Sequence, residues 1–341
     1  MKDYLTTLVA SIVIFGLLIF FHEFGHFIVA KRVGIGVLEF AIGFGPKLIS
    51  VERGGTRYSL RALPLGGFCR LMGEDPEEVE DQSSFLKKPL AHRFAVIVAG
   101  PLMNFILAII LFFLIYFFIF GVPSTQVREV LPDGRAAQTE LQAWDIIRAI
   151  DGTEMRSWDD IIAAINASPE EELVLTIERD GNLREINVVP MEEPETQRGL
   201  IGIAPEGKKF SLLGSLRLGI ENTWYFTRFI VVSLSQIITR QASPEVAGPI
   251  GIVQMVGEVA QTGLSNLLSL AAILSIHLGL LNLLPIPALD GSRLVFFLVE
   301  GIRGKPVDPH KESFIHFVGF TLLILLMILI AFQDIARLQL F

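Results

Sequence analysis

Four stretches of the chain are apolar over roughly the 20 residues that a helix needs to cross the hydrocarbon core of a membrane. They lie at residues 5–29, 94–120, 264–284 and 314–332. The chain is 51% hydrophobic but also 19% charged, so we expect water-facing parts besides the spans. The pattern predicts an α-helical polytopic membrane protein with about four transmembrane helices.

The first apolar stretch is also close in length to a secretory signal peptide. Its start carries Lys2 and Asp3 rather than a basic cluster, and no small-x-small cleavage site follows it. Removal of this stretch would also discard the two histidines described next. We therefore expect it to be retained as a span.

A His-Glu-Phe-Gly-His motif ends the first span, at residues 22–26. On a helix, His22 and His26 are one turn apart and face the same way, which suits two nitrogen ligands of one zinc ion. Glu23 lies beside them, where a general base for a zinc-activated water is needed. A chance pair of histidines is common in soluble helices, but ionisable groups at membrane depth are costly and usually functional. The motif predicts a metal site in a membrane.

A catalytic zinc site uses three protein ligands and leaves one position open. Asp290, His277 and Glu300 are the candidates for the third ligand. Two prolines, at 285 and 287, end the third span and present Asp290 on a turn. His277 lies about two to three turns deeper and is expected to bond a neighbouring helix, while Glu300 resembles a loop acid. Ligand type and depth favour Asp290.

Basic residues concentrate in the loop between the first two spans and in the loop between the last two, whereas residues 121–210 are rich in acids. Because basic loops stay on the cytoplasmic side, both termini and the acidic segment are expected outside. Lys31 follows His26 by five residues, roughly 8 Å along a helix. The metal motif is therefore expected near the cytoplasmic side, within reach of water.

Residues 40–61 have the pattern of short strands with glycine-rich turns, Gly54-Gly55 being a predicted hairpin. Such backbone at the membrane must be covered by protein or line a wet cavity. An exposed strand edge there could pair with an extended substrate, but an ordinary cytoplasmic hairpin fits the pattern equally well. The single cysteine, Cys69, allows neither an intramolecular disulfide nor a cysteine-rich zinc site, and we interpret it as a packed residue.

Residues 121–200 have the pattern of a water-facing α+β module. Strands are predicted at 127–130, 144–150, 173–179 and 183–189, and a helix at 158–166. Asp180-Gly181 predicts a hairpin between the last two strands. This order resembles a PDZ domain, whose groove accepts an extended segment along a strand edge. The usual Gly-Leu-x-x-Gly-Asp stands here as Glu-Leu-Gln-Ala-Trp-Asp at 140–145.

The region after this module is apolar but carries Arg217, Glu221 and Arg228. It is interpreted as amphipathic or interfacial, because a full crossing would move Asp290 to the wrong side of the membrane. Four domains are therefore expected. They are residues 1–120 with the first two spans, the zinc motif and the β-loop, residues 121–200 as an extracytoplasmic PDZ-like domain, residues 201–262 as the interfacial region, and residues 263–341 with the last two spans and the third ligand.

Taken together, His-Glu-Phe-Gly-His, Ala-Gly-Pro-Leu-Met-Asn at 99–104, the PDZ-like insert and Asn-Leu-Leu-Pro-Ile-Pro-Ala-Leu-Asp-Gly at 282–291 resemble the site-2 protease family of intramembrane zinc metalloproteases. The resemblance covers nearly the whole chain and is closest to bacterial RseP-type members with a single PDZ domain. It implies Zn²⁺ as cofactor and Asp290 as third ligand. It also implies that Asn282 helps to hold substrate and that Gly43-Phe44-Gly45 belongs to a membrane-entering β-loop. Ser292 stands where a second glycine often follows the Leu-Asp-Gly.

The function expected from this reading is hydrolysis of peptide bonds in the transmembrane segments of single-span substrates, such as anti-sigma factors or signal-peptide remnants, in a bacterial inner membrane. The expected partners are these substrates, the lipid bilayer and a peptide ligand of the PDZ domain, with no nucleic acid. A catalytically silent zinc-binding scaffold that uses its PDZ domain is the main alternative, although a structural zinc has no use for Glu23. A metal transporter would carry further ionisable residues deep in several spans, where only His277 qualifies.

Overall fold

The computed structural model describes residues 2–74, 82–119, 121–193, 198–239, 241 and 248–337. The chain divides into two compact units. The inserted unit is Tyr116–Ser215, and the helical unit joins Met1–Ile115 to Leu216–Phe341.

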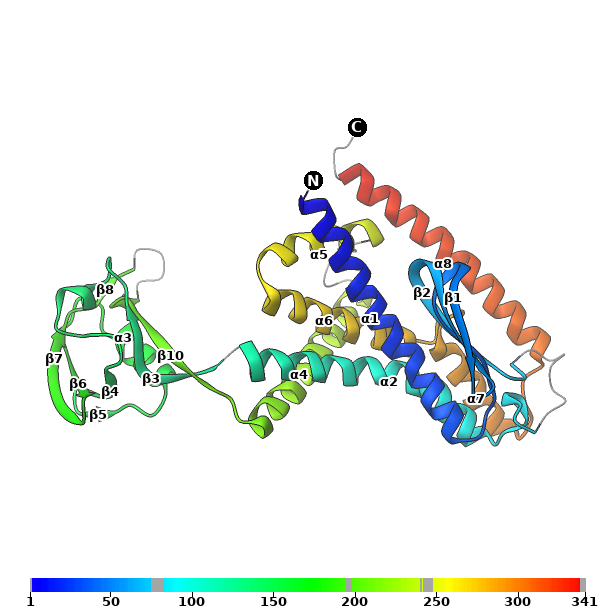
Figure 1. Ribbon diagram of the computed structural model, residues 1–341, viewed down its shortest axis with the longest axis horizontal. Helices are drawn as coiled ribbons and strands as arrows, with labels where there is room; N and C mark the ends of the chain where they lie inside the picture. The colour runs from blue at the N-terminus through cyan, green and yellow to red at the C-terminus, as the bar shows by residue number, and fades with distance from the viewer. Residues whose placement is uncertain are drawn as a thin grey trace. The chain divides into compact units, whose positions relative to one another are not determined.

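Four helices in the described part of the chain are long and apolar enough to cross a membrane. They are α1 (Lys2–Arg32), α2 (Leu90–Leu114, continued by a π-helical turn at Ile115–Ile119), α6 (Leu264–Leu283) and α8 (Pro309–Arg337). Each contains one of the predicted apolar stretches, except that α6 ends one residue before residue 284 and that Phe120 lies outside the described residues. The first turn of α1 and the last turn of α8 lie at the same end of the helical unit (Figure 1). The chain is a polytopic membrane protein, as the sequence predicts.

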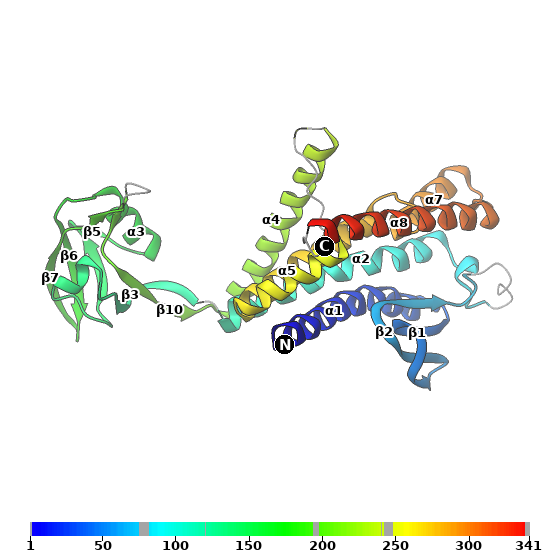
Figure 2. The same cartoon turned by 90° about the horizontal axis from the view of Figure 1, so that it is seen from above.

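Within the helical unit, α2 packs against both α1 and α6, and Figure 2 shows α1 and α2 side by side. Glycines allow the close approach that membrane helices use in place of a hydrophobic driving force. A Cβ on Gly25 of α1 would lie 2.2 Å from the carbonyl oxygen of Ala99 on α2. On the other side of α2, a Cβ on Gly279 of α6 would lie 3.1 Å from the carbonyl oxygen of Pro101.

Three further helices complete the helical unit: α4 (Leu212–Ile238), α5 (Pro249–Gln261) and α7 (Asp290–Arg303). α4 contacts α2 through the stacked rings of Phe112 and Phe226, whose centroids are 5.6 Å apart. Its other face exposes large side chains that include Trp224 and Tyr225. The exposed side chains of α4 are thus largely apolar, and the interpretation of this helix as amphipathic or interfacial stays a prediction.

A long antiparallel hairpin follows α1 and contacts it. It consists of β1 (Val37–Arg53) and β2 (Thr56–Leu71), and it turns at Gly54-Gly55 as predicted, with φ of 60° and 71°. The register shifts repeatedly along β1, which also contains Gly43 and Gly45 with φ of 89° and 82°. Such left-handed positions favour glycine and bend the strand. A short 3₁₀ turn (Phe85–Lys87) leads on to α2.

The inserted unit contains a six-stranded sheet of order β10-β3-β4-β6-β7, with β5 paired to β4. The strands are β3 (Gly121–Val130), β4 (Ile146–Ile150), β5 (Thr153–Glu154), β6 (Leu173–Arg179), β7 (Asn182–Val188) and β10 (Ile203–Lys209), and β8 (Met191–Glu192) pairs with β9 (Gly199–Leu200). The predicted strand at 144–150 begins two residues late, because Trp144 adopts a left-handed φ of 77°. The predicted hairpin at Asp180-Gly181 is confirmed by φ of 51° and 78°.

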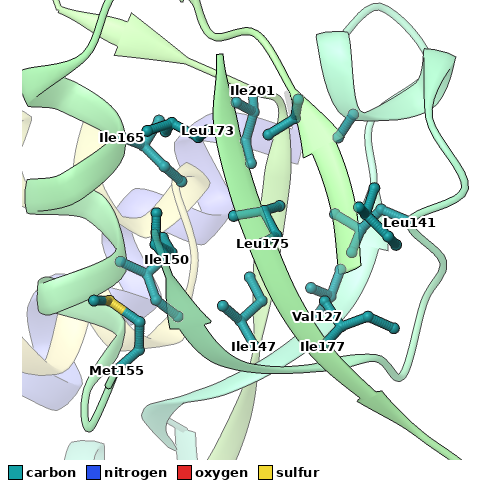
Figure 3. Close-up of a cluster of buried hydrophobic side chains, with 14 of the residues drawn as sticks. Val127, Leu141, Ile147, Ile150, Met155, Ile165, Leu173, Leu175, Ile177 and Ile201 are labelled. Atoms are coloured by element: carbon teal, nitrogen blue, oxygen red, sulfur yellow. The ribbon is translucent and has the colours of Figure 1, made fainter. Parts of the chain in front are cut away.

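Apolar side chains of the sheet and of α3 (Trp158–Ala167) form the core of the inserted unit. Leu175 and Ile177 of β6 and Ile147 of β4 are fully buried, and Figure 3 shows these side chains pointing into one cluster. Ser157 begins α3 with a capping box, in which its side chain accepts from the Asp160 N–H. A short 3₁₀ turn (Arg135–Gln138) precedes β4.

Candidate metal centre

Three buried or half-buried side chains converge where α1 passes the start of α7. His22 and His26 lie one turn apart on α1, with their Nε2 atoms 3.4 Å from each other. Asp290 Oδ2 lies 3.2 Å from each of these two nitrogens. The ligand atoms of these three residues all lie within 4.8 Å of one another, close enough to bind one metal ion.

The atoms of this cluster fit a zinc ion by type and by spacing. Zinc bonds of about 2.0–2.1 Å in a tetrahedral arrangement place neighbouring ligand atoms about 3.3 Å apart, and the three separations here are 3.2, 3.2 and 3.4 Å. Asp290 Oδ2 is buried and has no hydrogen-bond donor among the described residues. A buried carboxylate oxygen in this position needs a cation to offset its desolvation. Three protein ligands would leave the fourth position of a tetrahedral site open.

A tight turn between α6 and α7 presents Asp290. α6 ends at Leu283, and Ala288 adopts a left-handed φ of 77° just before α7 begins at Asp290. The N–H of Ala288 donates to Nδ1 of His316 on α8 at 3.1 Å. A Cβ on Gly291 would lie 2.1 Å from the carbonyl oxygen of Leu284, so this turn closes only with glycine at 291.

The two rejected candidates for the third ligand lie elsewhere. Nδ1 of His277 lies 3.0 Å from the carbonyl oxygen of Ile273 and donates to it within α6. The expectation that His277 bonds a neighbouring helix is therefore wrong, because its ring turns back onto its own preceding turn. Glu300 is not a free loop acid, since it forms an ion pair with Arg93 of α2.

Glu23 lines the same cavity, of about 450 Å³, as the three metal-site residues. The backbone N–H of Cys69 on β2 donates to the Glu23 carboxylate. Burial raises the pKa of the Cys69 thiol, and the nearby Glu23 charge adds to the rise, so the thiol stays protonated at neutral pH. Cys69 therefore brings its backbone to the site, in agreement with its interpretation as a packed residue.

Of the predicted substrate-holding residues, Asn282 lines this cavity and donates from Nδ2 to the carbonyl oxygen of Leu278 at 3.0 Å. The segment from Gly43 to Gly45 on β1 is not among the described residues that line this cavity. Phe44 stacks on Phe68, with ring centroids 6.4 Å apart, and Phe68 is part of that wall. The β-hairpin thus reaches the cavity through β2 rather than through the Gly43–Gly45 bend.

Sequence reasoning missed several residues around the ligands. Nδ1 of His26 donates to the carbonyl oxygen of Val96 at 2.8 Å, and the Asn104 amide lies 3.2 Å from Nδ1 of His22. Both partners belong to α2, and Asn104 is fully buried. A polar residue within an apolar span is itself a signal of function and could have found Asn104.

A second cavity, of about 780 Å³, lies next to the first and shares Glu74, Ala288, Arg293 and His316 with it. Arg293, one turn after Asp290, forms an ion pair with Glu74 at this shared wall. The ionisable lining makes the space suited to water. The metal centre is therefore not sealed within apolar side chains.

The chain is similar to known proteins over nearly its whole length. The model of peptidase family M50 matches residues 10–326. The chain is 37% identical to the zinc metalloprotease RasP of Geobacillus kaustophilus, over 99% of this chain and 99% of the relative. It is 36% identical to the regulator of sigma-W protease RasP of Bacillus subtilis, over 98% and 99%, and 35% identical to a putative zinc metalloprotease of Clostridium acetobutylicum, over 96% and 97%.

Among solved structures, the PDZ domain of an SdrC-like protein from Listeria innocua matches 26% of this chain and 99% of its own length. The identity is 23% and the TM-score 0.22.

Proposed function

Because the chain belongs to peptidase family M50, the site-2 protease family, and is a zinc metalloprotease, we propose that it cleaves peptide bonds within transmembrane segments of single-span membrane proteins. One observation carries the proposal. Two histidines of a membrane-spanning helix converge with Asp290 at tetrahedral ligand spacing, beside Glu23. A soluble substrate would not require this chemistry to be built into a membrane span.

We assign zinc to Nε2 of His22, Nε2 of His26 and Oδ2 of Asp290. When bound, zinc lowers the pKa of a water molecule and polarises the scissile carbonyl. Glu23 lines the same cavity and has no role as a ligand in this arrangement. Its carboxylate accepts the proton of the attacking water and later delivers it to the leaving amine.

The substrate must lose its helical form before it can be cleaved, because a helix hides its peptide carbonyls in hydrogen bonds. The wall of the catalytic cavity includes Phe68, Cys69 and Arg70 of β2. An extended substrate segment paired along this hairpin would present a carbonyl to the metal. Asn282, which also lines this cavity, would donate to the substrate backbone, and the bend of residues 43–45 would guide the segment.

The orientation follows from the distribution of charge. The basic loops around the metal centre lie in the cytoplasm of a bacterial cell, and both termini and residues 121–200 lie outside the inner membrane. The relatives named above are bacterial. In this orientation the cavity that Arg293 and Glu74 line is reached by water from the cytoplasmic side.

A groove in the inserted unit suits an extended peptide. It encloses about 410 Å³ between Trp158 and Ile161 of α3 and the segment of Leu200 and Ile201, with Arg198 at its wall. The lining is apolar apart from Asn166, Glu193 and Arg198, which fits an extended segment with apolar side chains. We propose a protein segment outside the membrane as its ligand.

The substrates we propose are single-span regulatory proteins of the anti-sigma class or signal-peptide remnants. A relative is named regulator of sigma-W protease, which supports the first class. The lipid bilayer is the second partner.

The test is cleavage of a single-span model substrate after reconstitution of the full chain into lipid vesicles, with zinc content measured alongside. Glu23→Gln is expected to keep zinc and to lose at least about 100-fold in cleavage, the usual range for a general base. Asp290→Ala is expected to lose both zinc and cleavage. Zinc-bound Glu23→Gln protein that cleaves at the wild-type rate would refute the general-base assignment. Zinc binding without cleavage by any variant, wild type included, would instead support a scaffold.

A further inference from the structure

We propose that Asn104 on α2 is a positioning residue for His22: its amide donates to Nδ1 without zinc and turns to accept from Nδ1–H when Nε2 of this histidine binds zinc. The inference rests on the zinc ligands proposed above. It assigns a purpose to the Asn of the Ala-Gly-Pro-Leu-Met-Asn motif that the reaction chemistry does not use.

Asn104 is fully buried between helices and approaches His22 from the side away from Asp290. Its amide nitrogen Nδ2 lies 3.2 Å from Nδ1 of His22. Its amide oxygen Oδ1 is buried and has no hydrogen-bond partner among the described residues. Ser275 of α6 donates to the backbone carbonyl of Asn104 at 2.8 Å, so this neighbouring hydrogen bond does not involve the amide.

The two histidines differ in what their Nδ1 atoms meet. A neutral imidazole carries one proton, and the nitrogen that binds a metal must be the unprotonated one. Nδ1 of His26 faces the carbonyl oxygen of Val96 at 2.8 Å. Because a carbonyl only accepts, His26 is fixed with its proton on Nδ1 and its Nε2 available to zinc. His22 has no such carbonyl and faces an amide instead.

An amide can serve either tautomer of His22. The arrangement in the structure, with Nδ2 toward Nδ1, suits the tautomer that is protonated on Nε2. A half-turn of the amide would present Oδ1 to Nδ1–H, which is the tautomer that zinc requires. The same half-turn would give the buried Oδ1 the partner that it lacks. After this half-turn, Oδ1 of Asn104 would accept from Nδ1–H of His22, just as the carbonyl oxygen of Val96 accepts from Nδ1–H of His26.

Packing alone does not account for this residue. A leucine of similar size would fill the same space between α1, α2 and α6 without burying an amide. A buried amide oxygen without a partner costs free energy, and one that gains a partner when zinc binds offsets that cost. Asp at this position could only accept, so it would support the zinc-binding tautomer alone.

The first test measures zinc affinity by competition with a chelator in wild type, Asn104→Leu and Asn104→Asp. Loss of a partner behind a metal-binding histidine typically weakens metal binding 10–100-fold, and this range is expected for Asn104→Leu. Asn104→Asp is expected to stay within a few-fold of wild type. Ser275→Ala is the matched control, because it removes the neighbouring hydrogen bond but not the amide, and it should bind zinc as wild type does. Wild-type affinity in Asn104→Leu, or equal loss in both variants, would overturn the proposal.

The second test reads the tautomer directly in the wild-type protein and does not depend on any variant folding. ¹⁵N spectra of histidine-labelled protein, with the His22 signal identified by its absence from His22→Ala, are recorded with zinc and after chelation. The proton of His22 is expected on Nδ1 with zinc and on Nε2 without it. A proton on Nδ1 in both states would contradict the proposal. Zinc binding that survives His22→Ala would instead refute the ligand assignment, which separates the two hypotheses.

Discussion

Gly100 on α2 lies directly against the imidazole ring of His26 on α1. A Cβ at Gly100 would lie 2.2 Å from Nε2 and 2.5 Å from Cε1 of this ring. Nε2 is also the atom that faces Asp290. The absence of a side chain at one position of α2 therefore determines where a proposed zinc ligand of α1 can stand.

Gly100→Ala should displace the His26 ring and separate Nε2 from Asp290. Real Cβ atoms do not come within 2.2 Å of another heavy atom, and the hydrogen bond from Nδ1 to the Val96 carbonyl limits how the ring can move. We expect zinc affinity to fall about 10–100-fold and cleavage to fall with it. Metal analysis of the purified protein and the vesicle cleavage assay measure both.

Gly16 provides the matched control for this substitution. It lies on the same helix as His26, and a Cβ there would meet nothing within 4 Å. Alanine favours helix over glycine by up to about 1 kcal/mol, so Gly16→Ala should leave zinc binding unchanged and stability equal or slightly higher. Equal loss of zinc in Gly16→Ala and Gly100→Ala would show that the effect is not local to the His26 ring.

The local pattern of the sequence was enough to predict the spans and the residues that meet at the metal centre. Helical spacing places His22 and His26 on one face, and ligand type together with depth in the membrane favours Asp290, which lies 3.2 Å from both. Turn chemistry likewise predicts the hairpin at Gly54-Gly55. These properties depend on a few neighbouring residues and on the thickness of the membrane, both of which a sequence contains.

The residues that surround the ligands could not be predicted in the same way. Gly100, Asn104 and His316 matter because of the face that α2 or α8 turns toward α1 and α7. That face depends on how two helices cross, and an apolar span has no alternation of polar and apolar residues to reveal it. The error over His277 has the same origin, since depth alone does not tell whether a ring points to a neighbour or back along its own helix.

The ion pair between Arg93 of α2 and Glu300 of α7 should be essential for stability. Arg93 is buried, its second nitrogen lies 3.1 Å from the other Glu300 oxygen, and its Nε donates to the Lys88 carbonyl. Removal of one partner leaves a buried charge unpaired, which costs about 3–5 kcal/mol. We expect Glu300→Gln to lower the midpoint of thermal unfolding in detergent markedly.

An exposed ion pair within α4 provides the control, because a Glu→Gln substitution there removes a charge that is not buried. Arg217 and Glu221 are paired at 2.7 Å, but both side chains are largely exposed. Such pairs contribute about 0.3–0.5 kcal/mol, so Glu221→Gln should scarcely change the midpoint. Similar shifts for Glu221→Gln and Glu300→Gln would contradict the role assigned to burial.

Glu39 should make the stability of the β-hairpin depend on pH. Burial alone would raise the pKa of this carboxyl, but hydrogen bonds from Ser59 at 2.6 Å and Arg61 at 2.8 Å outweigh it and hold the pKa below its ordinary value. A lowered pKa in the folded state gives stability that is present above about pH 4.3 and is lost as the pH falls through the folded pKa.

Hydrogen exchange of the hairpin amides in wild type and Glu39→Gln, compared at equal pH, measures this effect. Exchange should be faster in Glu39→Gln at pH 7, and the difference should shrink below about pH 4 because protonation then removes the same charge from wild type. A difference that does not change with pH would show that Glu39 acts through its shape rather than through its charge.

Asp334, near the end of α8, should hold that helix to α5. Its carboxylate is buried and accepts from the N–H of Gly248 at 3.2 Å and of Gly251 at 2.9 Å, at the first turn of α5, which has no side-chain cap of its own. Loss of a cap costs about 0.5–2 kcal/mol, and the charge adds to it at a helix N-terminus. Asp334→Ala should therefore speed hydrogen exchange at the first turn of α5 and lower the unfolding midpoint, whereas Ala at the exposed neighbour Gln333 should do neither. Unchanged exchange in Asp334→Ala would mean that α5 and α8 are held together by their apolar contacts alone.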